Sequence, residues 1–277
     1  QDARAQSDLP AVILLPGILG SNIAVNGKRI WLGLRMIGGL SQLAWPDAQD
    51  RVGAPDGPIG LIYDDLADHL RATHQVIEFA FDWRRPIEDE AKRLAQVVSE
   101  QLELRKSNNQ PVRFVAHSMG GLVVRTMQIV EPDLWKLAMA RDGARVLMLG
   151  TPNGGSWAPM QVLSGDDTFG NTLVAFGAPF GDHKARQLMA QFPGFLQLQA
   201  ALVDDQRKLE LESTWQRLAD EDLAAVRQFN WWHSGEAQLN AYRWGVPPQG
   251  VLDQAVELRR KLDAQREKQL AGFADKL

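Results

Sequence analysis

The chain has 277 residues, of which 45% are hydrophobic, and this is enough for one large α/β domain or two small ones. Its net charge of -4 and its lack of a basic block argue against a nucleic-acid partner, because phosphate binding needs a concentrated basic face. The sequence has no cysteine, which excludes disulfides, thiolate metal sites and cysteine nucleophiles. This composition suits a reducing compartment such as the cytoplasm, and no signal peptide or membrane span is expected in this chain, although the compartment itself stays open.

The first elements are predicted to be a buried strand and a hairpin. Residues 11–15 form a continuous apolar run that ends in a glycine-rich turn, residues 16–21. Asn26 and Gly27 lie between two short β-like runs, which is a strong local signal for a β-hairpin. Residues 33–60 are rich in glycine, proline and aspartate and predict a loop, and Trp31 and Trp45 are the expected packing anchors.

Predicted helices and strands then alternate as far as residue 150. The helical segments are 63–73, 87–106 and the stretch from Gly121 onward, and the strands are 74–81, 112–115 and 144–150. Such an alternation implies a parallel sheet with right-handed crossovers. Ligands of parallel sheets bind at the carboxyl edge of the strands, so the site is expected there.

After residue 156 the pattern changes to aromatic residues interleaved with helical segments. Residues 157–247 predict a mainly helical cap over the site, or alternatively a small helical subdomain with these aromatic residues as its own core. Residues 248–277 predict a helix that leads back toward the core, residues 1–156. Its apolar stripe consists of Leu252, Ala255, Leu258 and Leu262.

The stretch from Ala116 to Gly120 matches the nucleophile-elbow pattern, with alanine in place of the first glycine. Ser118 lies between the predicted strand and helix, where small neighbours allow a sharp turn and the serine occupies a sparsely allowed backbone region. The serine hydroxyl would then be exposed at the carboxyl edge of the sheet. The N–H of Met119, at the helix N-terminus, and the N–H of Ile18, in the first glycine-rich turn, are the expected oxyanion-hole donors.

A serine nucleophile also needs a histidine base that is oriented by a carboxylate. In proteins with this elbow the acid and the histidine follow the serine along the chain, which disfavours His69 and His74. His117, next to the serine, is expected to support the elbow. His183 and His233 remain, with Asp166, Asp167 or Asp182 as the acid, and the pair Asp167 and His183 is the candidate within the chain. The preferred expectation is that the acid, the histidine and the last sheet strands follow residue 277.

Asp82 and Arg84 lie in a tryptophan-containing turn after the strand at 74–81. They are expected to pair and fix a loop beside the site, or Asp82 caps the next helix, and both alternatives are structural roles.

Four segments together resemble the lecithin:cholesterol acyltransferase family. They are Val12–Ser21, Phe81–Arg84, His117–Gly121 and Gly150–Ser156, in the family's order and at similar spacing. The resemblance implies an α/β-hydrolase fold, Ser118 as nucleophile, and the Ile18 and Met119 N–H groups as the oxyanion hole. Alanine at 116 and the lack of the family's cysteines depart from its pattern.

The sequence therefore predicts an α/β-hydrolase parallel sheet with a helical cap that acts on an acyl ester, in particular a lipid ester, by hydrolysis or acyl transfer. No cofactor and no metal ion are expected. Transient contact with a membrane or lipid surface, and a place within a larger polypeptide, are the expected associations. The alternatives are a thioesterase or peptidase on the same scaffold, or a catalytically silent binding module.

Overall fold

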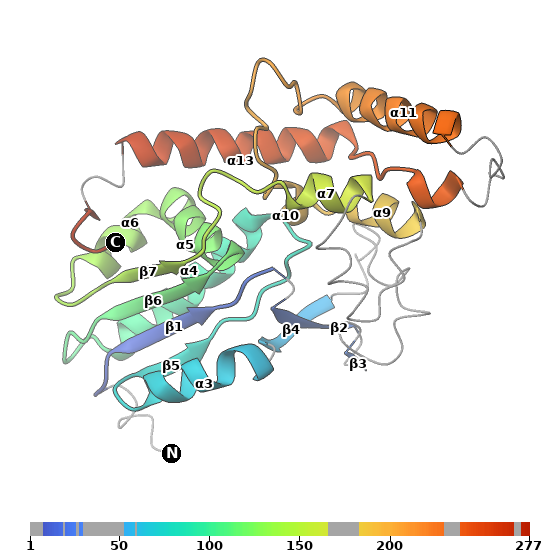
Figure 1. The fold of residues 1–277 in the computed structure, drawn as a ribbon. Helices are drawn as coiled ribbons and strands as arrows, with labels where there is room; N and C mark the ends of the chain where they lie inside the picture. Colours follow the sequence, from blue (N-terminus) through green and yellow to red (C-terminus); the bar gives the residue numbers. More distant parts are fainter. Residues whose placement is uncertain are drawn as a thin grey trace.

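The computed structural model describes residues 8–18, 20–25, 28–29, 53–58, 60–165, 183–229, 239–268 and 273–277 (Figure 1). Its centre is a four-stranded sheet in the order β5-β1-β6-β7. The strands are β1 (Ala11–Leu15), β5 (Gln75–Glu78), β6 (Val112–His117) and β7 (Val146–Leu149). All neighbouring pairs are parallel, so the predicted parallel sheet is confirmed.

Both faces of this sheet are covered by helices. Ala11, Ile13 and Leu15 face a large apolar core, whereas Val12 and Leu14 face a smaller one, which explains why β1 is apolar throughout. The helices on the large-core side are α4 (Ile87–Leu104), α5 (Met119–Val130) and α6 (Pro132–Met139), and α3 (Gly60–Arg71) covers the other side. Full burial of each large aliphatic side chain contributes about 1.5–3 kcal/mol, so the fully buried strand β1 contributes strongly to the stability of the fold.

A second sheet, in the order β3-β2-β4, lies beside the end of β1. β2 (Ser21–Val25) and β3 (Lys28–Arg29) pair antiparallel, which confirms the predicted hairpin. The predicted loop is wrong at one place, because residues 53–58 form β4 (Gly53–Pro58) and pair with β2. Proline is tolerated there because β4 is an edge strand. Trp31 and Trp45 lie outside the described residues.

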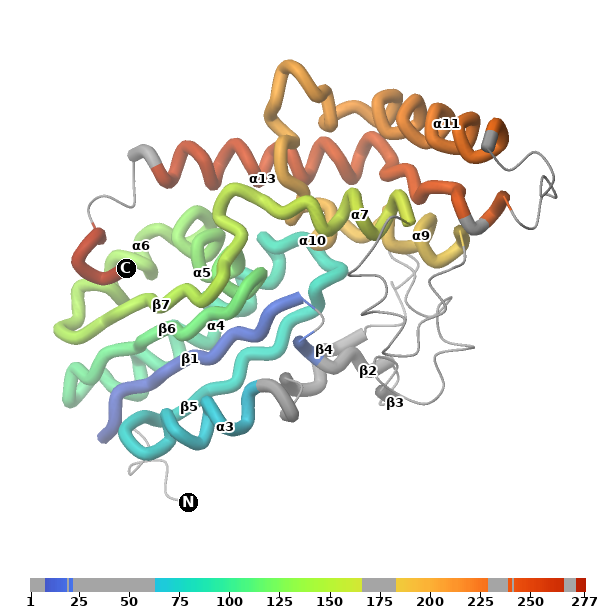
Figure 2. Tube along the Cα trace, viewed as in Figure 1, coloured from blue at the N-terminus to red at the C-terminus, as the bar shows by residue number. Residues whose placement is uncertain are grey.

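The described part of the chain after residue 157 contains helices and no named strand. The helices are α7 (Ala158–Ser164), α9 (His183–Met189), α10 (Pro193–Leu196), α11 (Glu212–Phe229), η3 (Asn240–Tyr242) and α13 (Gln249–Lys268). Figure 2 shows the chain leaving β7 and running over the end of the sheet into α7. Whether this region forms a cap over the site, as expected, stays a prediction.

Helix α13 crosses over α5 and also packs against α10. All four residues of its predicted apolar stripe are buried, namely Leu252, Ala255, Leu258 and Leu262. Beyond the helix, the Lys276 carbonyl accepts the N–H of Val146 at 2.7 Å, so the chain returns to the edge of β7. Among the described residues, no helix has the length and apolar character that a bilayer crossing requires.

Candidate active site

Ser118 lies in the turn between β6 and α5, at the carboxyl end of an inner strand of the sheet. Its backbone has φ 51° and ψ -122°, a conformation that side-chain-bearing residues rarely adopt. The turn is held by the Ser118 N–H, which donates to the Leu149 carbonyl at 2.8 Å, and by the Gly121 N–H, which donates to the Ser118 carbonyl at 3.1 Å. The serine is partly exposed, and its hydroxyl has no hydrogen-bond partner among the residues that the structure describes.

Small residues stand close to Ser118 at 116, 120 and 121, because other parts of the chain lie against these positions. A Cβ on Gly120 would lie 2.6 Å from the Pro16 carbonyl oxygen, and one on Gly121 would lie 2.6 Å from Thr151 Cγ2. Ala116 is fully buried and is paired with Leu15 on β1. The strand, the turn after β1 and the start of α5 therefore meet at one point, which explains the small residues that the sequence shows.

The turn after β1 brings Ile18 to the same point. Gly20 N–H donates to the Gly17 carbonyl at 3.0 Å, which fixes the peptide unit between Gly17 and Ile18. Because N–H and C=O point in opposite directions in a trans peptide, the Ile18 N–H is directed away from this internal bond. Neither the Ile18 N–H nor the Met119 N–H has an acceptor within the described ranges. Met119 begins α5, where the helix dipole also favours negative charge.

Gly17 lies against the serine itself. A Cβ on Gly17 would be 3.0 Å from Ser118 Cβ and 3.1 Å from His117 Nδ1. The structure therefore brings Ser118 together with the two segments that carry the expected oxyanion donors. Their catalytic roles stay predictions.

Tyr63 was not identified as a site residue from the sequence. Its hydroxyl accepts the Gly17 N–H at 2.8 Å and lies 2.9 Å from His117 Nδ1. Burial raises the pKa of Tyr63, and the hydrogen bond from Gly17 offsets this only in part, so the hydroxyl keeps its proton at neutral pH. The only signal in the sequence was a tyrosine on the buried face of a helix, since a buried tyrosine hydroxyl usually has a partner.

The loop after β7 is fixed by two buried arginines. Arg125 on α5 donates to Asn153 Oδ1 at 2.9 Å and to the Leu262 carbonyl at 2.7 Å, and Arg259 on α13 donates to the Asn153 carbonyl at 2.7 Å. Burial, followed by repulsion from Arg259, lowers the pKa of Arg125 to about 10, so it remains charged at neutral pH. These bonds join α5, α13 and the loop that lies against Gly121.

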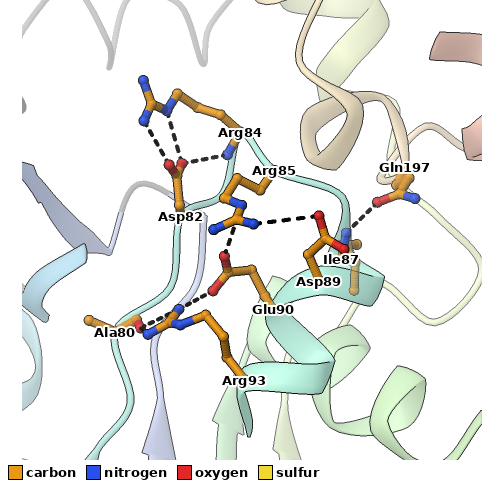
Figure 3. Close-up of polar contacts among 9 residues, drawn as sticks. All are labelled: Ala80, Asp82, Arg84, Arg85, Ile87, Asp89, Glu90, Arg93 and Gln197. Carbon is orange, nitrogen blue, oxygen red and sulfur yellow. Dashed lines mark hydrogen bonds and ion pairs between the residues drawn. The ribbon is translucent and has the colours of Figure 1, made fainter. Parts of the chain in front are cut away.

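Asp82 and Arg84 form a buried pair at the carboxyl end of β5 (Figure 3). The arginine donates from Nε to Asp82 Oδ1 at 2.9 Å and from its terminal nitrogen to Oδ2 at 2.7 Å, while its backbone N–H also reaches Oδ1. The expected pairing is therefore present. The alternative, in which Asp82 caps the next helix, is not formed, because Pro86 is the N-cap residue of α4 and makes no side-chain hydrogen bond. The pair shapes the loop that continues into α4.

Glu90 lies in the same cluster and is almost fully buried. It accepts a hydrogen bond from Arg93, and Arg85 Nε lies 3.7 Å from its other oxygen. Burial nevertheless raises the pKa of Glu90, because the loss of hydration outweighs the attraction of Arg93 and Arg85. The ion pairs and hydrogen bonds of the cluster join the loop after β5 to the first two turns of α4.

The expected in-chain acid and base are placed only in part. His183 begins α9 and lines a cavity of about 240 Å³ with residues of α11 and the segment 243–246; Ser118 is not among the lining residues. Asp167 lies outside the described residues, as do Asp166, Asp182 and His233. The pairing of Asp167 and His183 with Ser118 thus stays a prediction. Within the described ranges, no group of three His, Asp or Glu side chains could hold a metal ion.

A parallel sheet covered by helices on both faces, with a serine in the turn from an inner strand to its helix, defines the α/β-hydrolase class. Comparison with protein families narrows this class. The sequence profile of the lecithin:cholesterol acyltransferase family matches residues 53–194, and the chain belongs to that family. The match includes Phe81–Arg84, His117–Gly121 and Gly150–Ser156, whereas Val12–Ser21 precedes it. No curated protein sequence matches the chain.

Membership of this family supports acyltransferase or lipase-like activity, and acyl or lipid esters as substrates, at the level of the family.

Proposed function

We propose that the protein is a serine esterase or O-acyltransferase that acts on a lipid ester through an acyl-enzyme on Ser118. The observation that carries this proposal is the backbone of Ser118, which is held at φ 51° beside two N–H groups without acceptors in the described part of the chain. Strained serines persist only where the surrounding structure enforces them, and such positions are concentrated at active sites. The family to which the chain belongs supports the same chemistry.

In the proposed reaction, Ser118 Oγ attacks the ester carbonyl carbon while a histidine takes its proton. A C–O bond forms to the serine, and the carbonyl oxygen becomes an oxyanion that the Ile18 and Met119 N–H groups stabilise. When this intermediate collapses, the bond to the leaving alcohol breaks and the histidine returns the proton to that alcohol. Removing one such oxyanion donor typically lowers kcat about 10²–10³-fold, so the two N–H groups are a major part of the proposed catalysis.

The acyl-enzyme is then attacked either by water or by a second alcohol. Water yields a free fatty acid and an alcohol yields a new ester. In both cases the same histidine takes the proton of the attacking hydroxyl and returns it to Ser118 Oγ as the bond between Oγ and the acyl carbon breaks. A lipid acyl chain is supported by the apolar surface next to the loop after β7. A cavity of about 400 Å³ there is lined by Trp157, Met160 and Trp244 together with Gln161, Ser164 and Asp222; Ser118 is not among its lining residues, and Trp157 is 42% exposed.

A fluorophosphonate probe on the full-length protein tests the nucleophile. Ser118→Ala is expected to abolish labelling, whereas Ser99→Ala, on the exposed side of α4, is expected to label like the parent protein. Equal labelling of Ser118→Ala and the parent would refute the proposal. His183→Ala distinguishes the two possible sources of the base: loss of labelling would support His183, and retention would support a histidine elsewhere.

A panel of acyl esters, thioesters and amides, assayed with and without an acceptor alcohol, tests the reaction class. We expect turnover of long-chain esters, and a new ester product when an acceptor alcohol is present would identify acyl transfer. Preferential turnover of thioesters or amides would contradict the lipid-ester assignment while leaving Ser118 as the nucleophile.

A further inference from the structure

Tyr63 lies beneath the candidate site, on the face of the sheet opposite the large core. It projects from α3, is 6% exposed, and packs with Val12, Leu14 and Val115 from the two inner strands. Its ring therefore has a packing role that phenylalanine would fill equally well. The hydroxyl needs a separate explanation, because a buried hydroxyl without a hydrogen-bond partner is unfavourable.

The turn after β1 is wrapped around this hydroxyl. Gly17 N–H donates to it at 2.8 Å, and a Cβ on Gly20 would lie 3.1 Å from the same oxygen. The Gly17 carbonyl is bonded to Gly20 N–H on the other side. Two hydrogen bonds thus fix both peptide groups of Gly17, and Ile18, whose N–H is the proposed oxyanion donor, follows directly.

The same hydroxyl reaches the residue next to the nucleophile. Tyr63 Oη lies 2.9 Å from His117 Nδ1, and the two ring centroids are 6.0 Å apart. A tyrosine hydroxyl has one proton to donate, and its oxygen already accepts the Gly17 N–H. The hydroxyl can therefore donate its proton to His117 Nδ1 in the tautomer that carries the imidazole proton on Nε2. The raised pKa of Tyr63 agrees with a protonated donor.

We propose that Tyr63 is a positioning residue that holds the Ile18 oxyanion donor in register with Ser118, through hydrogen bonds to Gly17 and His117. This inference rests on the proposed function of Ser118. The hydroxyl is the one group that bonds both the turn carrying the first donor and the residue preceding the nucleophile among the described contacts. Without it, the turn and the elbow remain neighbours through the pairing of β1 with β6, but no side-chain hydrogen bond of a described residue links Gly17 to His117.

Tyr63→Phe isolates this effect, because it keeps the ring and removes only the hydroxyl. A misplacement of about 1 Å in an active site costs up to about 10²-fold in rate, so we expect labelling by a fluorophosphonate to slow about 10–100-fold. Tyr242→Phe is the matched control: Tyr242 is the only other tyrosine, and it is 45% exposed. The measurements are the second-order rate constant of labelling and the final labelled fraction of the full-length protein.

A slower rate with an undiminished final fraction, together with parent-like behaviour of Tyr242→Phe, would support the positioning role. An unchanged rate for Tyr63→Phe would overturn it, and so would a lower final fraction with an unchanged rate in the labelled molecules, since that is a folding defect. Ser118→Ala separates this from the proposed function: full labelling of Ser118→Ala refutes both, whereas loss in Ser118→Ala with a parent rate in Tyr63→Phe refutes only the role of Tyr63.

Discussion

Gly120 is the second residue of α5, and it leaves no room for a side chain between the helix and the turn after β1. A Cβ at this position would lie 2.6 Å from the Pro16 carbonyl oxygen and 2.8 Å from Leu15 Cβ. Ordinary contacts begin at 3.4 Å, so Gly120→Ala requires the helix start and the turn to separate by about 0.8 Å. Both proposed oxyanion donors are adjacent to this contact, one residue before Gly120 and two residues after Pro16.

The expected effect on stability is small because two contributions oppose each other. Overpacking costs about 1–3 kcal/mol, while replacing glycine by alanine in a helix contributes up to about 1 kcal/mol of stability. The rate is more sensitive, since a displacement close to 1 Å between nucleophile and donors costs up to about 10²-fold. We therefore expect Gly120→Ala to lower kcat for a chromogenic ester by one to two orders of magnitude, with a change of only a few degrees in Tm.

Gly250→Ala is the matched control, because Gly250 lies in the first turn of α13 with no atom within 4 Å of the added methyl group. It should retain the parent kcat. The assay compares initial rates of ester hydrolysis with thermal unfolding of the same samples. If Gly120→Ala keeps the parent kcat, the close approach of the turn and the helix does not position the catalytic groups, and the reasoning is wrong.

Two further predictions concern the loop beside the site. Gly194→Ala should destabilise the protein by about 1–3 kcal/mol, as measured by urea unfolding, because the added Cβ would lie 2.5 Å from the Trp83 carbonyl oxygen. An unchanged midpoint of unfolding would contradict this packing. Burial raises the pKa of Glu90 despite its contact with Arg93, so the folded state loses stability as pH rises from the ordinary value of 4.5 through the raised one. The free energy of unfolding of Glu90→Gln, relative to that of the parent, should therefore increase across this pH range. Glu103→Gln, at an exposed position, is the control and should show a constant difference from the parent. A pH-independent difference for Glu90→Gln would count against the raised pKa.

Those parts of the fold that depend on local pattern could be predicted from the sequence. The apolar run at 11–15 and the amphipathic stretch from Ile87 both formed the expected elements. Burial of a strand on both faces leaves a continuous apolar run, and burial of one helix face leaves an apolar residue every three or four positions. The strand-turn-helix around Ser118 was visible for the same reason. The pairing of Asp82 with Arg84 needed only two residues in one short turn.

Features created by pairing between distant segments could not be predicted. Residues 53–58 contain two prolines and two glycines and resemble a loop, yet they form an edge strand because β2 supplies hydrogen-bonding partners. The helix after Ser118 was predicted without its break at Glu131, although Pro132 at the first position of α6 carried that signal. Tyr63 is 46 residues from Gly17 and 54 from His117, so its contacts leave no trace in any short window.

The docking of α10 into the core limits how the protein could be divided. Phe192 packs edge-on against Trp83, with the ring centroids 5.6 Å apart. Gln197 accepts the N–H of Ile87 at 2.7 Å, so this segment provides a hydrogen-bond acceptor for the first N–H group of α4. Phe195 is fully buried in the same core as the sheet. A chimera that exchanged the whole helical region with that of another protein would remove these supports along with it. A chimera that exchanges the helical region would therefore have to keep residues 192–199 together with the sheet of the original protein.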